Sequence, residues 1–184
     1  MRSVTAALSA GILASAGALL CAGPGCALGQ ASTAATASTA ASAATIASAE
    51  VTIVGPDGRA KRFTAGMLAA LPVARVSATS HEKTVAYSGA DLVDVLRAAG
   101  IDPPDHLRGA TVRRVLLAQG ADGYTAAFSF AELDATLGGR KIYLVDRADD
   151  KPLADDGPWR LVVPQDARAA RWVRQLTRLT VVDP

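Results

Sequence analysis

The first 49 residues of this chain carry a single charged side chain, Arg2, and are otherwise apolar, small or uncharged polar. Residues 32–49 in particular are a low-complexity run of Ala, Ser and Thr without periodicity, which is typical of a flexible, disordered linker. Such a stretch has no patterned face that a core could bury. The folded part is therefore predicted to span residues 50–184, about 135 residues, which is enough for one ordinary hydrophobic core.

Residues 1–31 follow the order of a secretory signal peptide: Arg2, an apolar stretch over residues 4–20, and then small residues. The apolar stretch is short and diluted with Gly and Ala for a spanning helix. We therefore expect cleavage and a periplasmic or secreted protein, with no membrane span after the signal is removed. An uncleaved anchor, or a lipoprotein signal processed at Cys21 or Cys26, is the alternative.

The composition excludes several classes of protein. Nineteen Lys and Arg against seventeen Asp and Glu are too balanced for an electrostatic nucleic-acid binder. Cys21 and Cys26 are the two cysteines of the chain, too few for a disulfide-dense scaffold. Both lie in the predicted leader, so the mature domain is expected to contain no thiol. A hydrophobic fraction of 50% argues against a disordered protein.

The pattern along residues 50–184 predicts an α+β domain, rich in mixed or antiparallel strands, with a few short helices. Pro56, Asp57 and Gly58 are turn residues inside a hairpin over 51–63. Short helices are predicted at 65–71 after Thr64, at 88–100 after a capping residue Ser88, and at 129–133, where Ser129 and Glu132 form a capping box. Further extended segments are expected at 73–85, 111–118, 124–128, 141–146, 159–163 and 176–182.

Familiar catalytic motifs are absent from the sequence. It contains no phosphate-binding loop, no dinucleotide fingerprint and no nucleophile elbow. His81 and His106 are far apart and are expected to be solvated, without the spacing of a zinc site. The paired carboxylates at 149–150 and 155–156 lack calcium-loop spacing and are interpreted as solvated turn residues.

The last quarter of the chain is rich in arginine, whose guanidinium fork suits phosphate and other oxyanions. A small anionic ligand is one interpretation. The other is that these side chains pair with nearby aspartates on a solvated face. The residues concerned are Arg160, Arg168, Arg171, Arg174 and Arg178.

Four strings occur in a characteristic order: YSGADLVDVLRAAGI at 87–101, GADGYTAAFSFAEL at 120–133, KIYLVDRADDKPL at 141–153 and GPWRLVVPQDARAARWVRQLTRLTV at 157–181. Together they resemble the oxidoreductase molybdopterin-binding domain family, which has the fold of sulfite oxidase and its bacterial relatives. The resemblance covers residues 84–182, and the stretch 157–172 is the most specific part. It implies a sulfite-oxidase-like fold and molybdopterin as the possible cofactor. The cofactor-binding positions it indicates are Arg168 and Arg171, toward the pterin phosphate, with Tyr124 and Arg160.

The sequence departs from the family pattern in two places. Gln165 and Asp166 replace residues that are commonly small, and Asp166 puts a carboxylate beside the expected phosphate. The family's molybdenum-ligating cysteine belongs in residues 73–88, which contain Ser77, Thr79, Ser80 and His81 but no thiol, the soft donor that molybdenum needs.

We therefore assign no catalytic residue and no metal ligand. The sequence is compatible with two hypotheses, one enzymatic and one not. One hypothesis is an exported oxidoreductase that uses molybdenum on an oxyanion substrate. The other is a non-catalytic module of the same fold whose partner is a small anion or a periplasmic protein.

Overall fold

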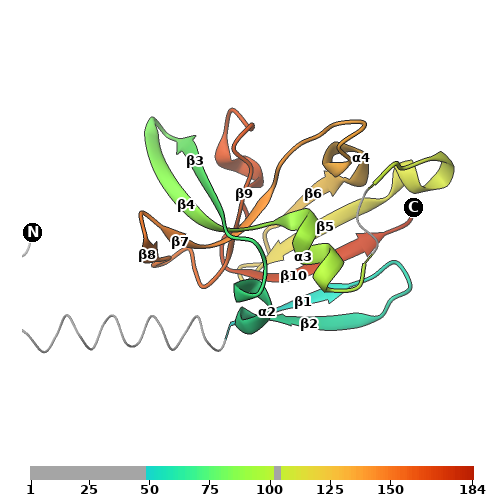
Figure 1. Cartoon of the computed structure of the whole chain (residues 1–184), viewed down its shortest axis with the longest axis horizontal. Helices are drawn as coiled ribbons and strands as arrows, with labels where there is room; N and C mark the ends of the chain where they lie inside the picture. The colour runs from blue at the N-terminus through green and yellow to red at the C-terminus, as the bar shows by residue number, and fades with distance from the viewer. Residues whose placement is uncertain (1–48, 102–104) are drawn as a thin grey trace, which may run out of the picture. The chain divides into compact units, whose positions relative to one another are not determined.

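The computed structural model describes residues 49–101 and 105–184, which form two β-sheets and several short helices (Figure 1). The predicted signal peptide, residues 1–31, and all of the predicted linker except Ala49 lie outside the described residues. Within the described part, no helix is long and apolar enough to cross a membrane.

The first sheet has the strand order β2-β1-β10-β5-β6. Its β1 and β10 are parallel, and every other neighbouring pair is antiparallel. The hairpin predicted over 51–63 is confirmed as β1 and β2, and Gly58 in its turn has a φ of 76°. The strands are β1 (Glu50–Val54), β2 (Ala60–Thr64), β5 (Val115–Gly120), β6 (Thr125–Ser129) and β10 (Leu176–Val182).

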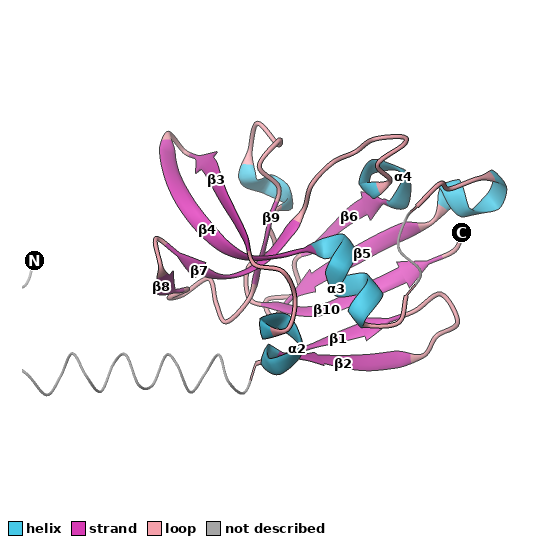
Figure 2. Ribbon diagram, in the orientation of Figure 1, coloured by secondary structure: helices cyan, strands magenta, loops and turns pink. Residues whose placement is uncertain are grey.

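The second sheet is antiparallel throughout, with the order β3-β4-β7-β8, and β9 pairs with β7 outside this path. Its β3–β4 hairpin projects away from the first sheet (Figure 2). The predicted α+β class, with mixed and antiparallel sheets, is confirmed. The strands are β3 (Ala74–Ser80), β4 (Lys83–Asp91), β7 (Tyr143–Ala148), β8 (Lys151–Pro152) and β9 (Arg160–Val162).

The helices are short and lie at the ends of strands. They are α2 (Ala65–Ala69), α3 (Leu92–Ala98) and α4 (Phe130–Leu133), with two 3-10 turns at Gly109–Arg113 and Ala169–Arg171. The capping box predicted for α4 is present: the Ser129 hydroxyl accepts from the Ala131 amide at 3.1 Å, and Glu132 accepts from the Ser129 amide.

The predicted start of the helix at Ser88 is wrong. Ser88 lies inside β4, opposite Arg75 of β3 and Arg147 of β7, and the true cap of α3 is Asp91, whose carboxylate accepts from the Val93 amide at 2.9 Å. Because β4 pairs with β3 on one side and β7 on the other, the strand continues to Asp91, three residues beyond the predicted helix start. The strand predicted at 111–118 likewise begins later, at Val115, because a 3-10 turn precedes it.

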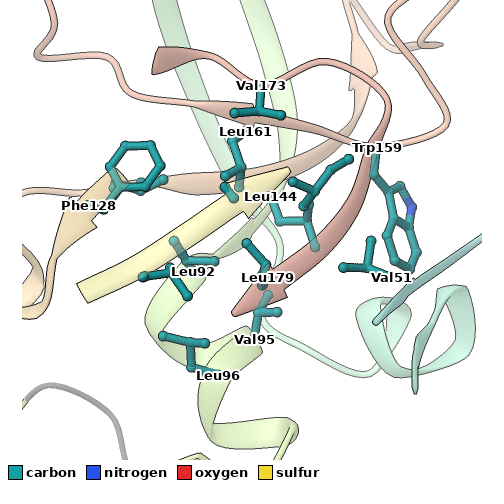
Figure 3. Close-up of a cluster of buried hydrophobic side chains, with 14 of the residues drawn as sticks. Val51, Leu92, Val95, Leu96, Phe128, Leu144, Trp159, Leu161, Val173 and Leu179 are labelled. Carbon is teal, nitrogen blue, oxygen red and sulfur yellow. The ribbon is translucent and has the colours of Figure 1, made fainter. Parts of the chain in front are cut away.

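A single buried core joins the two sheets (Figure 3). Leu144 of β7, Leu161 of β9 and Leu179 of β10 are all fully buried in it. Trp159, also fully buried, packs edge-on against Phe63 with ring centroids 5.8 Å apart. This core fixes the relative positions of β4, β7 and β9, the strands that carry the candidate site.

Candidate anion-binding site

A cavity with a volume of about 500 Å³ opens beside the second sheet. Its walls come from β4, from the β7–β8 turn, from the segment that follows β8, and from the start of β9. The polar residues that line it are Lys83, Tyr87, Asp149, Lys151, Asp155, Asp156, Arg160 and Arg174.

Arg160 is the best-fixed cation of this cavity, with a side chain only 13% exposed. Its guanidinium lies 5.4 Å from the ring centroid of Trp172 and 5.9 Å from that of Tyr87, within cation–π range. It forms an ion pair with Asp156, which also lies 3.6 Å from Arg174. Asp156 is thus shared between two arginines, as expected if the arginines of this segment pair with nearby aspartates.

Three other donors around the cavity have no hydrogen-bond or ion-pair partner in the described part of the chain. Among the described residues, neither Lys83 nor Lys151 forms an ion pair or a side-chain hydrogen bond, and the Tyr87 hydroxyl forms no hydrogen bond. Burial raises the pKa of Tyr87 above its ordinary value, and the charge of Arg160 opposes this shift. The phenol therefore stays protonated at neutral pH and can donate to a bound anion.

The predicted phosphate position Arg171 lies in a different cluster. Its Nε and Nη2 donate to the two carboxylate oxygens of Asp166 at 2.9 and 2.7 Å, and its Nη1 donates to Glu132 at 3.0 Å. Arg140 donates to the same Asp166 at 2.9 Å. These contacts raise the pKa of Arg171, with the Asp166 hydrogen bonds as the largest cause. The guanidinium fork is thus filled by carboxylates of the chain itself.

The other two predicted residues do not join the main cavity. Arg168 is exposed and contacts no partner among residues 49–101 and 105–184. Tyr124 is 50% exposed and donates to the Ala170 carbonyl. Tyr124 lines a smaller cavity of about 210 Å³ together with Trp172 and Arg174, so Arg174 borders both cavities.

Sequence reasoning missed several residues of these sites. Lys83 and Tyr87 lie in β4 and Lys151 lies in β8, and no sequence spacing links them to Arg160 at the start of β9. Glu132 was identified only as a capping residue, although it also binds Arg171. The sequence signals for the second cluster were Arg171 itself, the interpretation that the arginines pair with nearby aspartates, and Asp166, a carboxylate at a position expected to be small.

The residues at the position expected for the family's metal ligand do not supply a thiolate to molybdenum. The stretch 73–88 forms the β3–β4 hairpin, on which Ser77 and Thr79 are exposed and the inward position is held by the buried Ala78. The Thr79 hydroxyl is bonded to Thr84 and the Ser80 hydroxyl to His81, so these donors do not converge. No group of three or more His, Cys, Asp or Glu side chains that could hold a metal occurs in the described part of the chain.

Similarity to known proteins is found among solved structures and among protein families. No curated protein matches the chain. The sulfane dehydrogenase SoxCD from Paracoccus pantotrophus has a similar structure, with a TM-score of 0.57 and 20% sequence identity. The match covers 73% of this chain but only 38% of that one, so the chain spans well under half the length of that structure. The likeness shows a shared fold.

The family described as "Oxidoreductase molybdopterin binding domain" matches residues 57–184. This range includes both sheets apart from β1, and every residue of the two cavities and of the Arg171 cluster. The family resemblance first drawn from residues 84–182 is thereby confirmed and extended toward the N-terminus. The chain belongs to the oxidoreductase molybdopterin binding domain family.

Proposed function

We propose that this protein is a non-catalytic, exported member of its family that binds a small anion in the 500 Å³ cavity. The observation that carries the proposal is the gathering of three donors around the fixed guanidinium of Arg160, none of which has a partner among the described residues: Lys83, Tyr87 and Lys151. Export rests on the leader-like composition of residues 1–31.

The electrostatics of the cavity favour an anion over a cation. Four cationic side chains line it against three carboxylates. Asp156 is already engaged by Arg160 and Arg174, and Asp149 accepts from the Ala86 amide at 3.0 Å. The carboxylates are therefore largely satisfied within the chain. The lysines and the phenol hydroxyl still have donors to offer a ligand.

We infer a non-catalytic role because the residues expected to hold the family's cofactor are either missing or already occupied. When bound, molybdopterin supplies a metal for two-electron and oxygen-atom chemistry, and the metal is held by a thiolate. The hairpin where that thiolate is expected holds hydroxyls and Ala78 instead. The expected phosphate ligand Arg171 is occupied by Asp166 and Glu132. We therefore derive no step through the cofactor.

Calorimetric titration of the full chain with sulfate, phosphate and small dicarboxylates tests the proposal. Arg174→Ala is expected to weaken binding about tenfold, the loss of one charge-assisted contact. Arg178→Ala is the control: it removes the same charge from an exposed position of β10 that lines neither cavity. Equal losses in the two variants, or no binding of any of these anions, would contradict the proposal.

A second pair of variants isolates the phenol hydroxyl. Tyr87→Phe removes a single donor from the cavity wall, and we expect affinity for the anion to fall by about five- to tenfold. Tyr143→Phe makes the same change on β7, outside both cavities, and should leave affinity unaltered. An unchanged affinity in Tyr87→Phe would remove this hydroxyl from the site.

A further inference from the structure

We propose that Arg140 and Arg171 form a second oxyanion-binding site, which the carboxylate of Asp166 occupies as an internal ligand. When that carboxylate is removed, a tetrahedral oxyanion such as inorganic phosphate binds in its place. The residues of this site line neither cavity, so the inference does not depend on anion binding in the 500 Å³ cavity; it shares with the proposed function only the pairing of Arg171 with Asp166.

Asp166 is held as a bound anion would be held. Its carboxylate accepts three hydrogen bonds of 2.7 to 2.9 Å from two guanidinium groups. Two of them come from Nε and Nη2 of Arg171, the paired geometry in which arginine recognises carboxylate and phosphate alike. The Asp166 side chain is only 11% exposed, so these contacts replace most of its hydration.

Arg171 keeps its position without help from Asp166. Its guanidinium lies 5.1 Å from the ring centroid of the fully buried Phe128, and its Nη1 is bonded to Glu132. Glu132 is fixed in turn by the capping box of α4, where it accepts from the Ser129 amide. The fork facing Asp166 is therefore preorganised from two other sides.

The second cation is anchored through its backbone. The Arg140 amide donates to the Glu132 carbonyl at 2.7 Å, and the Gly138 amide donates to the Ala131 carbonyl at 2.9 Å. The approach is so close that a Cβ on Gly138 would lie 2.6 Å from the Cα of Glu132. This packing holds the segment carrying Arg140 against α4 whatever residue occupies position 166.

The charge and exposure of the cluster suit a solvent-borne anion. Two guanidinium groups face two carboxylates, so the present cluster is neutral, and loss of the Asp166 charge leaves it cationic. The Arg171 and Arg140 side chains are 29% and 41% exposed. An anion from solution can therefore reach both once the internal carboxylate is gone.

The test compares phosphate binding to the full chain and to Asp166→Ala by calorimetry at fixed ionic strength. We expect phosphate to bind at least tenfold more tightly to the variant, and the gain to disappear when Arg171→Ala is added. Repeating the comparison in an Arg174→Ala background separates this site from the cavity, since the gain must persist there even if the cavity binds nothing.

Unchanged phosphate affinity in folded Asp166→Ala would overturn the inference, as would a gain that survives Arg171→Ala. If circular dichroism shows that the alanine variant does not fold, Asp166→Ser serves in its place, because it removes the charge and vacates the fork while keeping a polar side chain. The same tenfold criterion applies to it. A rise in the thermal unfolding midpoint in phosphate relative to chloride, seen in the variant but not in the parent, provides a second readout.

Discussion

Gly89→Ala should destabilise the domain severely, because a side chain at this position of β4 would collide with the backbone of β7. A Cβ at position 89 would lie 2.0 Å from the Leu144 carbonyl oxygen and 2.6 Å from the Cα of Val145. Both are backbone atoms of the paired strand, so no side-chain rotation relieves the clash. The register shift between Ser88 and Gly89 shows that the strand already adjusts here.

The size of the stability loss follows from how far β4 and β7 must separate to make room for the new Cβ. Restoring a normal contact distance requires the strands to separate by more than an ångström, which overpacking data place at about 1–3 kcal/mol. One or two lost hydrogen bonds of the ladder add about 1 kcal/mol each. We expect a loss of about 2–5 kcal/mol in the free energy of unfolding, a large part of a typical domain's stability of about 5–15 kcal/mol.

Urea denaturation followed by circular dichroism measures this loss. Gly66→Ala in α2 is the matched control, because the nearest atom to its Cβ, the Thr64 hydroxyl oxygen, is 3.9 Å away. There the same substitution should stabilise the helix by up to about 1 kcal/mol. The reasoning is refuted if Gly89→Ala unfolds within about 0.5 kcal/mol of the parent chain.

Three further variants test the scaffold. The Thr136 hydroxyl and the Leu107 amide hold the pKa of the buried Asp134 below its usual value, so their stabilisation is present at neutral pH and is lost as the pH falls through that lowered pKa. Asp134→Asn should therefore flatten the acid limb of a stability-against-pH curve, and an unaltered limb would contradict this assignment. Ser129→Ala removes the cap of α4 and should cost about 1 kcal/mol in urea denaturation. Leu161→Ala should cost about 2–5 kcal/mol, and a smaller loss would show that the core collapses around it.

Local chemistry made much of the fold predictable. The turn residues Pro56 to Gly58 and the pair Ser129 and Glu132 act within a few residues of themselves, and the elements they predict are present. The C-terminal strand was also placed correctly, because it is a local run rich in β-branched and apolar residues. Ser88 misled the prediction because a Ser-x-x-Asp pattern suits a strand as well as a helix start, and pairing with β7 decides between them.

The candidate sites depend on contacts that no local pattern contains. Lys83 and Lys151 come together only through the register of β4, β7 and β8. The pairing of Asp166 with Arg171 was one of the two interpretations of the arginine-rich segment, but its contact with Arg140, 26 residues away, is one that no local pattern indicates. The arginine-rich segment was indicated by composition, but its division into a cavity residue, Arg160, and an internally paired residue, Arg171, required the tertiary structure.

The most direct test of the non-catalytic assignment is the molybdenum and pterin content of the full-length gene product, purified from its native host without added cofactor. Elemental analysis and fluorescence of released pterin give the two values against protein concentration. We expect neither to rise above background, because the hairpin offers no thiolate and Arg171 is filled by Asp166. Molybdenum at one equivalent per chain would contradict the proposal and restore the oxidoreductase hypothesis.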